Sequence, residues 1–517
     1  MVVGCARIRV MQGSSVADRE LLDTAALCGH LVPAGSVYAF LAEHRQRVFP
    51  DEMFADLFPS GRGRPSVPAD VIAAALVLKE LEGLSDRQAA AALSRDIAWK
   101  AACGLPLDED SFDASVFVYW RRRLNASERP HRIDEAVKDV AAQTGILNGK
   151  ARRALDSTVL DDAVATQDTV TQLVAAIRKV RRLVPEAATV AVSAHDYDHG
   201  GKPDIAWDDE TARDALVSAL VADAIAIIDC LPVTGLDEDA ERAVALLALI
   251  AGQDVEPGEE PGTWRIARAV AKDRVVSVVD DESRHAHKSR ASYRDGYKGH
   301  IACEPETGLV TANTVTAGNT GDGEVAVELL EGEDEPVEVL ADSAYGGGAT
   351  RCDLAEAGHA TVVKPLPLRP AVPGGFDRDD FTVCHDAGTV TCPNNHTVTI
   401  SAKGHATFGR RCEGCPLRDR CTTSRSGRSL RIGRHDRELV AARAQAATPE
   451  FAEAYPRRSL AERSISWLMK DGHRRCRYRG VKRNQLGFSL RVAAVNLTRL
   501  LNLGLHHDNG WKVPEAA

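Results

Sequence analysis

The sequence predicts an α/β fold that follows an all-α domain and is interrupted by a small cysteine-rich β segment. Three observations lead to this prediction. Residues 66–104 have apolar side chains at helical spacing, residues 274–358 alternate short β-branched strands with helices, and five cysteines fall within residues 384–421. A chain of 517 residues has room for several domains of the usual ~100–200 residues.

The composition is that of an ordinary globular protein, with 44% hydrophobic and 27% charged residues. These fractions exclude disordered and fibrous proteins. The most apolar run, residues 215–231, contains Asp223 and Asp229 and is shorter than the ~20 residues that span a bilayer. Residues 1–10 carry two arginines and no cleavage pattern of a secretory signal. We therefore expect a cytoplasmic protein with no membrane partner.

Charge is distributed unevenly along the chain. The formal net charge is -10, yet residues 401–500 contain 23 Lys and Arg against 8 Asp and Glu, which is 23 − 8 = +15 and leaves −25 elsewhere. This asymmetry favours a polyanion bound by one part of the surface. An arginine-rich face that is solvated and salt-bridged accounts for the same count.

After an N-terminal tail (1–35), residues 36–150 predict a helical domain. One helix follows Pro68 and stops at Gly83, and a second begins at Ser85, where Gln88 completes a capping box. The pair resembles a DNA-binding helix-turn-helix, and a small helical bundle fits the spacing equally well. Upstream, Arg62 and Arg64 in R-G-R-P either enter an A·T-rich minor groove or belong to a flexible linker.

The α/β domain is expected to comprise residues 151–364 and 436–505. Its strands are predicted at 154–160, 274–279, 299–303, 309–315 and 336–341, with helices at 324–330 and 354–358. An alanine-rich helical insertion (164–262) separates the first strand from the second. Residues 365–435 are a turn-rich insertion that contains the cysteines, and residues 506–517 form a C-terminal tail.

Two carboxylates occupy positions where an apolar residue is expected: Asp156 inside a strand and Asp342 at the end of another. A buried carboxylate needs a cation or hydrogen-bond donors. If the two strands are neighbours, both carboxylates can bind one divalent cation, and oxygen ligands suit Mg²⁺ or Mn²⁺. The alternative is that each aspartate caps a turn. Asp161 and Asp162 rank behind Asp156 because they follow the predicted strand.

Glu462 is the third candidate carboxylate. Locally, Ser459 and Glu462 match an S-x-x-E capping box, so Glu462 can simply close a helix. The surrounding segment, however, interleaves basic and aromatic residues, which suits phosphates and unstacked bases. This basic-aromatic stretch comprises Tyr455, Arg457, Arg458, Arg463, Trp467, Lys470, His473, Arg474, Arg475, Arg477, Tyr478, Arg479, Lys482 and Arg483.

The order of these motifs resembles that of bacterial insertion-sequence DDE transposases. Asp156 lies in L-D-S-T-V-L, Asp342 in V-L-A-D-S-A-Y-G, and Glu462 in Tyr-x2-Arg-x3-Glu. The resemblance extends over nearly the whole chain, since residues 63–124 are similar to the family's helical N-terminal domain. Residues 297–300 and 316–322 are similar to motifs upstream of its second aspartate. The family often has a lysine seven positions after the glutamate, whereas this chain has Met469 there and Lys470 next.

The resemblance implies a ribonuclease H-like catalytic domain, in which the two aspartates come from adjacent strands and the glutamate from a later helix. Asp156, Asp342 and Glu462 would then hold two Mg²⁺ (or Mn²⁺) ions for cleavage of DNA at the element ends and transfer of the 3′-hydroxyl to target DNA. The implied partners are double-stranded DNA, as terminal inverted repeats and target, and a second copy of the chain. DNA contacts are expected from Tyr455, Arg458, Lys470, Arg62, Arg64 and Lys298.

The cysteine-rich insertion has the ligand spacing of a zinc knuckle. Cys412 and Cys415 form C-x2-C, and Cys392 and Cys421 lie close in sequence, with His396 as an alternative fourth ligand. A bound Zn²⁺ would be structural, because this segment has few apolar residues for a core of its own. Reduced thiols without a metal are the alternative. For the whole chain, the alternatives are a non-catalytic DNA-binding protein and a metal-dependent nuclease without strand transfer.

Overall fold

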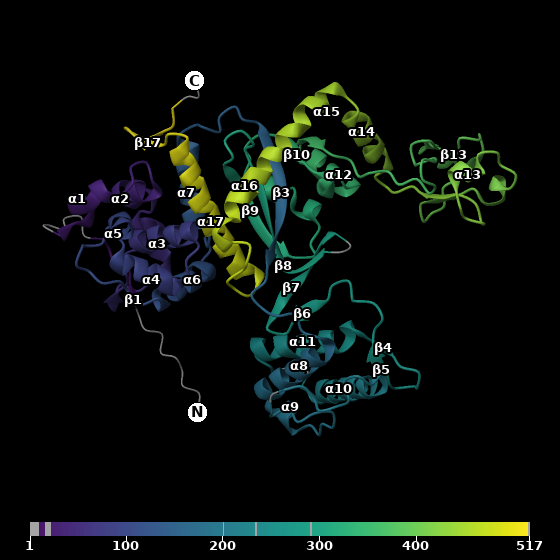
Figure 1. Ribbon diagram of the computed structural model, residues 1–517, viewed down its shortest axis with the longest axis horizontal. Coiled ribbons are helices and arrows are strands. Elements are labelled where there is room, and N and C mark those ends of the chain that lie inside the picture. The colour runs from purple at the N-terminus through teal and green to yellow at the C-terminus, as the bar shows by residue number, and fades with distance from the viewer. Residues whose placement is uncertain (1–9, 16–21, 200, 233–234, 290–291, 515–517) are drawn as a thin grey trace.

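The computed structural model describes residues 10–15, 22–199, 201–232, 235–289 and 292–514. A helical N-terminal domain and a curved sheet lie on opposite sides of one long helix, α17 (Val481–Asn502) (Figure 1). A second group of helices lies below the sheet, and a small β-rich segment projects to the right. The mixed α/β class predicted from the sequence is confirmed.

The N-terminal domain is built around α3 (Ala69–Glu82), which is buried from residue 69 to residue 80. The capping box that opens α4 (Asp86–Arg95) is confirmed, because the Ser85 hydroxyl accepts the Gln88 amide and Gln88 accepts the Ser85 amide. The helices around them are α1 (Thr24–Cys28), α2 (Val37–Val48), α5 (Ile97–Cys103), α6 (Ser115–Ala126) and α7 (Arg132–Gln143). The α3–α4 pair therefore forms part of a larger helical bundle with a continuous apolar core.

The sheet is centred on β3 (Arg152–Asp161). On one side, β10 (Glu338–Ala341) and then β11 (Ala360–Val363) extend it in parallel. On the other side, β8 (Ser292–Cys303) runs antiparallel to β3. The far edge of β8 pairs with β7 (Asp280–Ser289) near its start and with β9 (Val310–Ala317) along the rest, and β6 (Val275–Ser277) pairs with β7.

Several predicted elements differ in detail from the observed ones. The helix expected at 324–330 is divided into two 3-10 turns, Asp322–Val325 and Glu328–Leu330. The helix α12 (Gly348–Glu356) starts inside the glycine run rather than after it. The last segment contains α14 (Asp436–Ala446), α15 (Pro449–Ala454), α16 (Ser459–Leu468) and α17, with irregular backbone between the last two.

The helix α17 belongs to two cores at once. Leu490 and Leu497 pack in the core of the N-terminal domain, whereas Phe488 and Val492 pack against the sheet. The sheet accommodates α17 closely because residue 299 is glycine, and a Cβ there would lie 2.9 Å from Cζ of Phe488. Residues 481–502 thus join two domains that are hundreds of residues away in sequence.

Arg491 is the polar centre of this junction. Its buried guanidinium donates to the carbonyls of Leu468 (3.0 Å) and Trp467 (2.6 Å) in α16 and of Glu80 (2.6 Å) and Leu81 (3.0 Å) in α3. We expect Arg491→Met to lower the free energy of unfolding by about 3 kcal/mol, because it leaves buried carbonyls without donors. Urea denaturation measures the loss. The exposed Arg483 of the same helix supplies the control Arg483→Met, and an equal effect of both variants would contradict this role.

The helical insertion between β3 and β8 has a core of its own. It contains α8 (Thr169–Leu183), α9 (Pro185–Thr189), α10 (Glu210–Cys230) and α11 (Glu238–Gln253), followed by the hairpin of β4 (Val255–Pro257) and β5 (Trp264–Ile266). Asp223 in α10 is buried and accepts the Tyr197 hydroxyl at 2.8 Å.

Among the described residues, no helix has both the length and the apolar character needed to cross a bilayer.

The cysteine-rich insertion consists of short strands: β12 (Thr382–Cys384), β13 (Thr389–Thr391), β14 (Thr397–Thr399), β15 (His405–Thr407) and β16 (Ser429–Arg431). These strands make two small antiparallel sheets, and a small apolar cluster that includes Phe381 and Phe408 lies between them. Within the predicted C-terminal tail, β17 (His506–His507) pairs with β18 (Trp511–Lys512). Trp511 packs on Phe40 and His44 of the N-terminal domain.

Candidate active site

Asp156 and Asp342 come from neighbouring parallel strands. Leu340 of β10 pairs with Ala154 of β3, and continuing this register puts Asp342 level with Asp156. Asp342 directly follows β10 and also caps the next turn, because its side chain accepts the Ala344 amide at 2.8 Å. Asp342 therefore caps a turn, as the alternative predicted, and also lies level with Asp156.

Glu462 lies in the first turn of α16, which packs on β3. The local capping alternative does not form, since the residue before the helix is Arg458 and the Ser459 hydroxyl donates to the Pro456 carbonyl instead. Glu462 Oε1 accepts from Arg458 Nη2 at 2.7 Å, and its side chain is 60% exposed. The glutamate is thus accessible and held beside an arginine.

The charges of Asp342 and Glu462 both act on Asp156. The pKa of Asp156 is raised to about 6, chiefly by burial and also by the charges of Asp342 and Glu462, although the Ser157 amide and Arg458 act to lower it. Arg458 is therefore the cation that partly balances a cluster of three negative charges. A set of hard oxygen donors around one cation suits Mg²⁺ or Mn²⁺. Without an ion, the three carboxylates do not all approach within 4.8 Å of one another.

Tyr345 and Asp322 border the carboxylates and were not singled out from the sequence. The Tyr345 hydroxyl is buried without a hydrogen-bond partner among the described residues. Burial raises its pKa well above the usual value, and the charges of Asp322, Asp156 and Asp342 add to this effect. Tyr345 lies in the V-L-A-D-S-A-Y-G motif and Asp322 in the motif at residues 316–322, and only these positions in the sequence could have indicated that the two residues lie near the site.

Lys298 was predicted to contact DNA, but it forms internal contacts. Its ammonium pairs with Asp322 at 2.9 Å and donates to the Thr320 carbonyl at 2.8 Å, and its side chain is only 15% exposed. The neighbouring His300 ring bonds the Thr316 hydroxyl at 2.9 Å. These contacts join the two motifs upstream of Asp342 to each other.

Tyr455 and Arg458 form a small stack beside the carboxylates. The ring of Tyr455 stacks on Phe451 with centroids 5.1 Å apart, and the Arg458 guanidinium lies over Tyr455.

Lys470 is exposed in a 3-10 turn after α16. Arg62 and Arg64 are exposed as well, and the backbone of Arg64 pairs with Val10.

The basic-aromatic stretch divides into a structural part and an exposed part. Arg474 donates to the Thr158 hydroxyl and the Val159 carbonyl of β3, Arg477 donates to the carbonyls of Gly83 and Leu84, and His473 contacts Glu80. These side chains dock the N-terminal domain and β3 and do not offer a free phosphate site. Apart from Arg477, the exposed cations of the stretch are Arg463, Lys470, Arg475, Arg479, Lys482 and Arg483.

Of these, Arg479, Lys482 and Arg483 line a large cleft of about 1080 Å³ between α6, the helical insertion, residues 278–282 and the start of α17. Arg121 and Arg242 in its walls are paired with Asp86 and Asp281. The other six cations have no ion pair among the residues that the structure describes; they are Arg122, Lys179, Arg182, Arg479, Lys482 and Arg483. The sequence could not reveal this cleft, because its walls come from segments that lie far apart along the chain.

Asp161 and Asp162, the second choices for Asp156, lie at the other end of β3. Asp161 pairs with Arg294 at 3.0 Å, and the buried Asp162 accepts the Ser283 hydroxyl at 2.7 Å. The charges that chiefly shift the pKa of Asp156 come from Arg458, Asp342 and Glu462 instead. Asp161 lies inside β3 rather than after it, and the preference for Asp156 stays a prediction.

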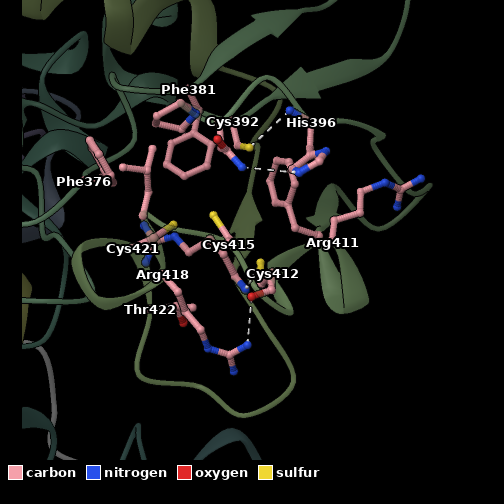
Figure 2. Close-up of a pocket in the computed structure, with 15 residues that line it drawn as sticks. Phe376, Phe381, Cys392, His396, Arg411, Cys412, Cys415, Arg418, Cys421 and Thr422 are labelled. Atoms are coloured by element: carbon pink, nitrogen blue, oxygen red, sulfur yellow. Dashed lines mark hydrogen bonds between the residues drawn. The ribbon is translucent and has the colours of Figure 1, made fainter.

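The four predicted zinc ligands line one pocket in the cysteine-rich insertion. Figure 2 shows Cys392, Cys412, Cys415 and Cys421 around it, with His396 beside Cys392. Burial raises the pKa of Cys421, and the other three thiols raise it further, so all four sulfurs are electrostatic neighbours. Backbone amides of His396 and Arg428 point at the sulfurs of Cys392 (3.4 Å) and Cys412 (3.5 Å).

Comparisons with known families match two separate segments. Residues 391–501, which contain Glu462 and the four cysteines, match the transposase DDE domain. Residues 28–123 match a family described as transposase domain (DUF772). A comparison with curated proteins and another with solved structures found no match. Together, the two matched segments are similar to domains of insertion-sequence DDE transposases.

Proposed function

We propose that the protein cleaves DNA at the ends of its insertion sequence and joins the resulting 3′-hydroxyl to target DNA. The observation that carries this proposal is the electrostatic convergence of Asp342 and Glu462 on Asp156. A ribonuclease H-like catalytic domain is part of the proposal. Its support is that the two aspartates come from adjacent parallel strands and the glutamate from a later helix that packs on the sheet.

Asp156, Asp342 and Glu462 are the residues proposed to hold two Mg²⁺ or Mn²⁺ ions. When bound, such a pair supplies activation of the attacking hydroxyl and stabilisation of the leaving oxygen in an in-line displacement at phosphorus. Arg458 neutralises the carboxylates in the absence of metal and is free to contact a phosphate once cations replace it. Tyr455, stacked on Phe451, presents a ring against which an unpaired base can stack.

The basic cleft is proposed as a surface for the DNA duplex beside the cleavage site. Six cations that form no ion pair within the described part of the chain line it, and phosphate neutralisation is the main source of affinity in such surfaces. The cysteine-rich insertion is proposed to bind one structural Zn²⁺ through Cys392, Cys412, Cys415 and Cys421. Amides directed at two of the sulfurs favour thiolates there.

The test supplies a labelled DNA end fragment, a target plasmid and Mg²⁺ to the full-length protein. Cleavage at the element end together with covalent joining to the plasmid is expected. Cleavage without joining would support the nuclease alternative, and binding without cleavage would support a non-catalytic DNA-binding protein. A denaturing gel distinguishes cleavage from joining, and a native gel detects binding without cleavage.

Charge reversal in the cleft should weaken DNA binding. We expect Arg182→Glu to lower the affinity for an end duplex about tenfold at moderate salt. The slope of log K against log salt concentration should also become shallower, by the amount that corresponds to about one phosphate contact. Arg178 lies on the same helix, is exposed and does not line the cleft, so Arg178→Glu is the matched control. Fluorescence anisotropy across a salt series measures both. Equal losses in the two variants would contradict a role for the cleft.

Asp156 should destabilise the metal-free fold above pH 6. Its pKa is raised from 3.8 to about 6, so the charged form of the side chain is disfavoured in the folded state. The resulting loss in the free energy of unfolding is absent below pH 3.8 and complete above about pH 6. We expect Asp156→Asn to raise the free energy of unfolding by about 1–2 kcal/mol at pH 8 with EDTA, after allowance for solvent screening. The gain should shrink as pH falls to 5. Thermal melts check this, with the exposed Asp334→Asn as control.

A further inference from the structure

A second group of metal-ligating side chains lies outside the carboxylate site and the cysteine knuckle. Cys352 is in α12, whereas His435 and Glu438 are at the start of α14, 83 and 86 positions later. One ligand atom of each residue lies within 4.8 Å of the other two, and Cys352 Sγ is 3.1 Å from His435 Nδ1. Among the residues that the structure describes, this is the one group of three potential ligands that meets so closely.

The spacing is close to that of a bound zinc ion. Tetrahedral Zn²⁺ with Zn–S near 2.3 Å and Zn–N near 2.1 Å separates the two ligand atoms by about 3.5 Å. Small side-chain movements therefore suffice to admit the ion. A thiolate, an imidazole and a carboxylate form a mixed set that suits Zn²⁺ better than Mg²⁺ or Ca²⁺.

Two further observations point to a built site. Glu438 Oε2 is shielded from solvent and has no hydrogen-bond partner among the described residues, which is costly unless a cation satisfies it. His435 is pressed against the start of α12, where a Cβ on Gly348 would lie 2.4 Å from the His435 Cβ. The absence of a side chain at position 348 thus lets the histidine reach Cys352.

Cys352, His435 and Glu438 lie on helices on either side of the cysteine-rich insertion in sequence. The helix α12 lies before the cysteine-rich insertion, with β11 between them, and α14 follows the insertion, so the three side chains join two helices that flank it in sequence (Figure 1). The helix α12 also follows the turn that Asp342 caps. We propose that Cys352, His435 and Glu438 bind a structural Zn²⁺, distinct from the knuckle zinc, that clasps α12 to α14 at the base of the insertion.

Zinc content of the full-length protein tests this proposal independently of DNA cleavage. After exhaustive dialysis, mass spectrometry should show that Cys352→Ser and His435→Gln each bind one zinc fewer per chain than wild type. Cys384→Ser is the matched control, because Cys384 is an exposed thiol of the insertion and lies outside both ligand sets. The knuckle variant Cys412→Ser/Cys415→Ser should lose a different zinc, so combining it with Cys352→Ser should remove both.

Cobalt substitution and thermal melts complete the test. In a knuckle-deficient background, Co²⁺ should still give thiolate-to-metal absorption that Cys352→Ser abolishes. With a chelator present, Cys352→Ser and wild type should melt at the same temperature, which shows that the variant folds, and added zinc should raise the melting temperature of wild type more. Unchanged zinc content in either Cys352→Ser or His435→Gln would overturn the proposal, whatever the outcome of the cleavage assay.

Discussion

Asp342→Ala should lower the rate of DNA end cleavage at least about a thousandfold, the largest effect expected of any single substitution. Asp342 stands level with Asp156 on the neighbouring strand, and its loss removes one of three carboxylates proposed to hold the metal ions. A metal site that supplies several kcal/mol of transition-state stabilisation translates into such a factor. Single-turnover cleavage of a labelled end fragment in Mg²⁺ measures it.

The matched control is Asp334→Asn, since Asp334 is an exposed carboxylate shortly before the same strand. It should cleave at the wild-type rate. DNA affinity of Asp342→Ala, measured without metal, should stay near wild type because the substitution removes a negative charge and leaves the basic cleft intact. If Asp342→Ala cleaved as fast as Asp334→Asn, the assignment of the active site would be wrong.

Cys412→Ser/Cys415→Ser should unfold the cysteine-rich insertion while the rest of the chain stays folded. The insertion has only a small apolar cluster, and structural zinc contributes an apparent ~10–16 kcal/mol to folding in small zinc domains. We expect limited proteolysis within residues 365–435 to accelerate at least about a hundredfold. Mapping the cleavage sites by mass spectrometry identifies the unfolded region.

Cys384→Ser, at an exposed cysteine of the same insertion, should leave the proteolysis rate unchanged. Treating wild type with a strong zinc chelator should reproduce the effect of the double substitution. Resistance of the double variant to protease would mean that the four cysteines are reduced thiols without a structural metal, which is the alternative that their spacing leaves open.

Local sequence patterns predicted most of the elements around the candidate site. The strand containing Asp156 and the strand ending at Asp342 were found from β-branched texture, and the structure makes them parallel neighbours. The capping box at Ser85 formed as expected, whereas the equivalent pattern at Ser459 did not. Both patterns satisfy the same local rule, and at Ser459 the preceding 3-10 turn continues directly into α16 and leaves no free first amide to cap.

Charge patterns were less informative than hydrophobic ones. The basic-aromatic stretch reads as one surface in the sequence, yet Arg474 and Arg477 bind backbone carbonyls of other segments, and only part of the stretch reaches the cleft. Lys298 likewise pairs with Asp322. A cation contacts whichever anion or carbonyl the fold brings near, and this choice does not depend on its neighbours in sequence.

By itself, the sequence determined the α/β class, the helical N-terminal domain, the cysteine cluster and the order of the three carboxylates. These features depend on residue spacing within one strand, one helix or one loop, where backbone geometry sets the period. The tertiary structure alone decided that α17 fills two cores, that several distant segments form the basic cleft, and that Cys352 meets His435 and Glu438. Such contacts arise from side-chain packing across the fold, which no local period encodes.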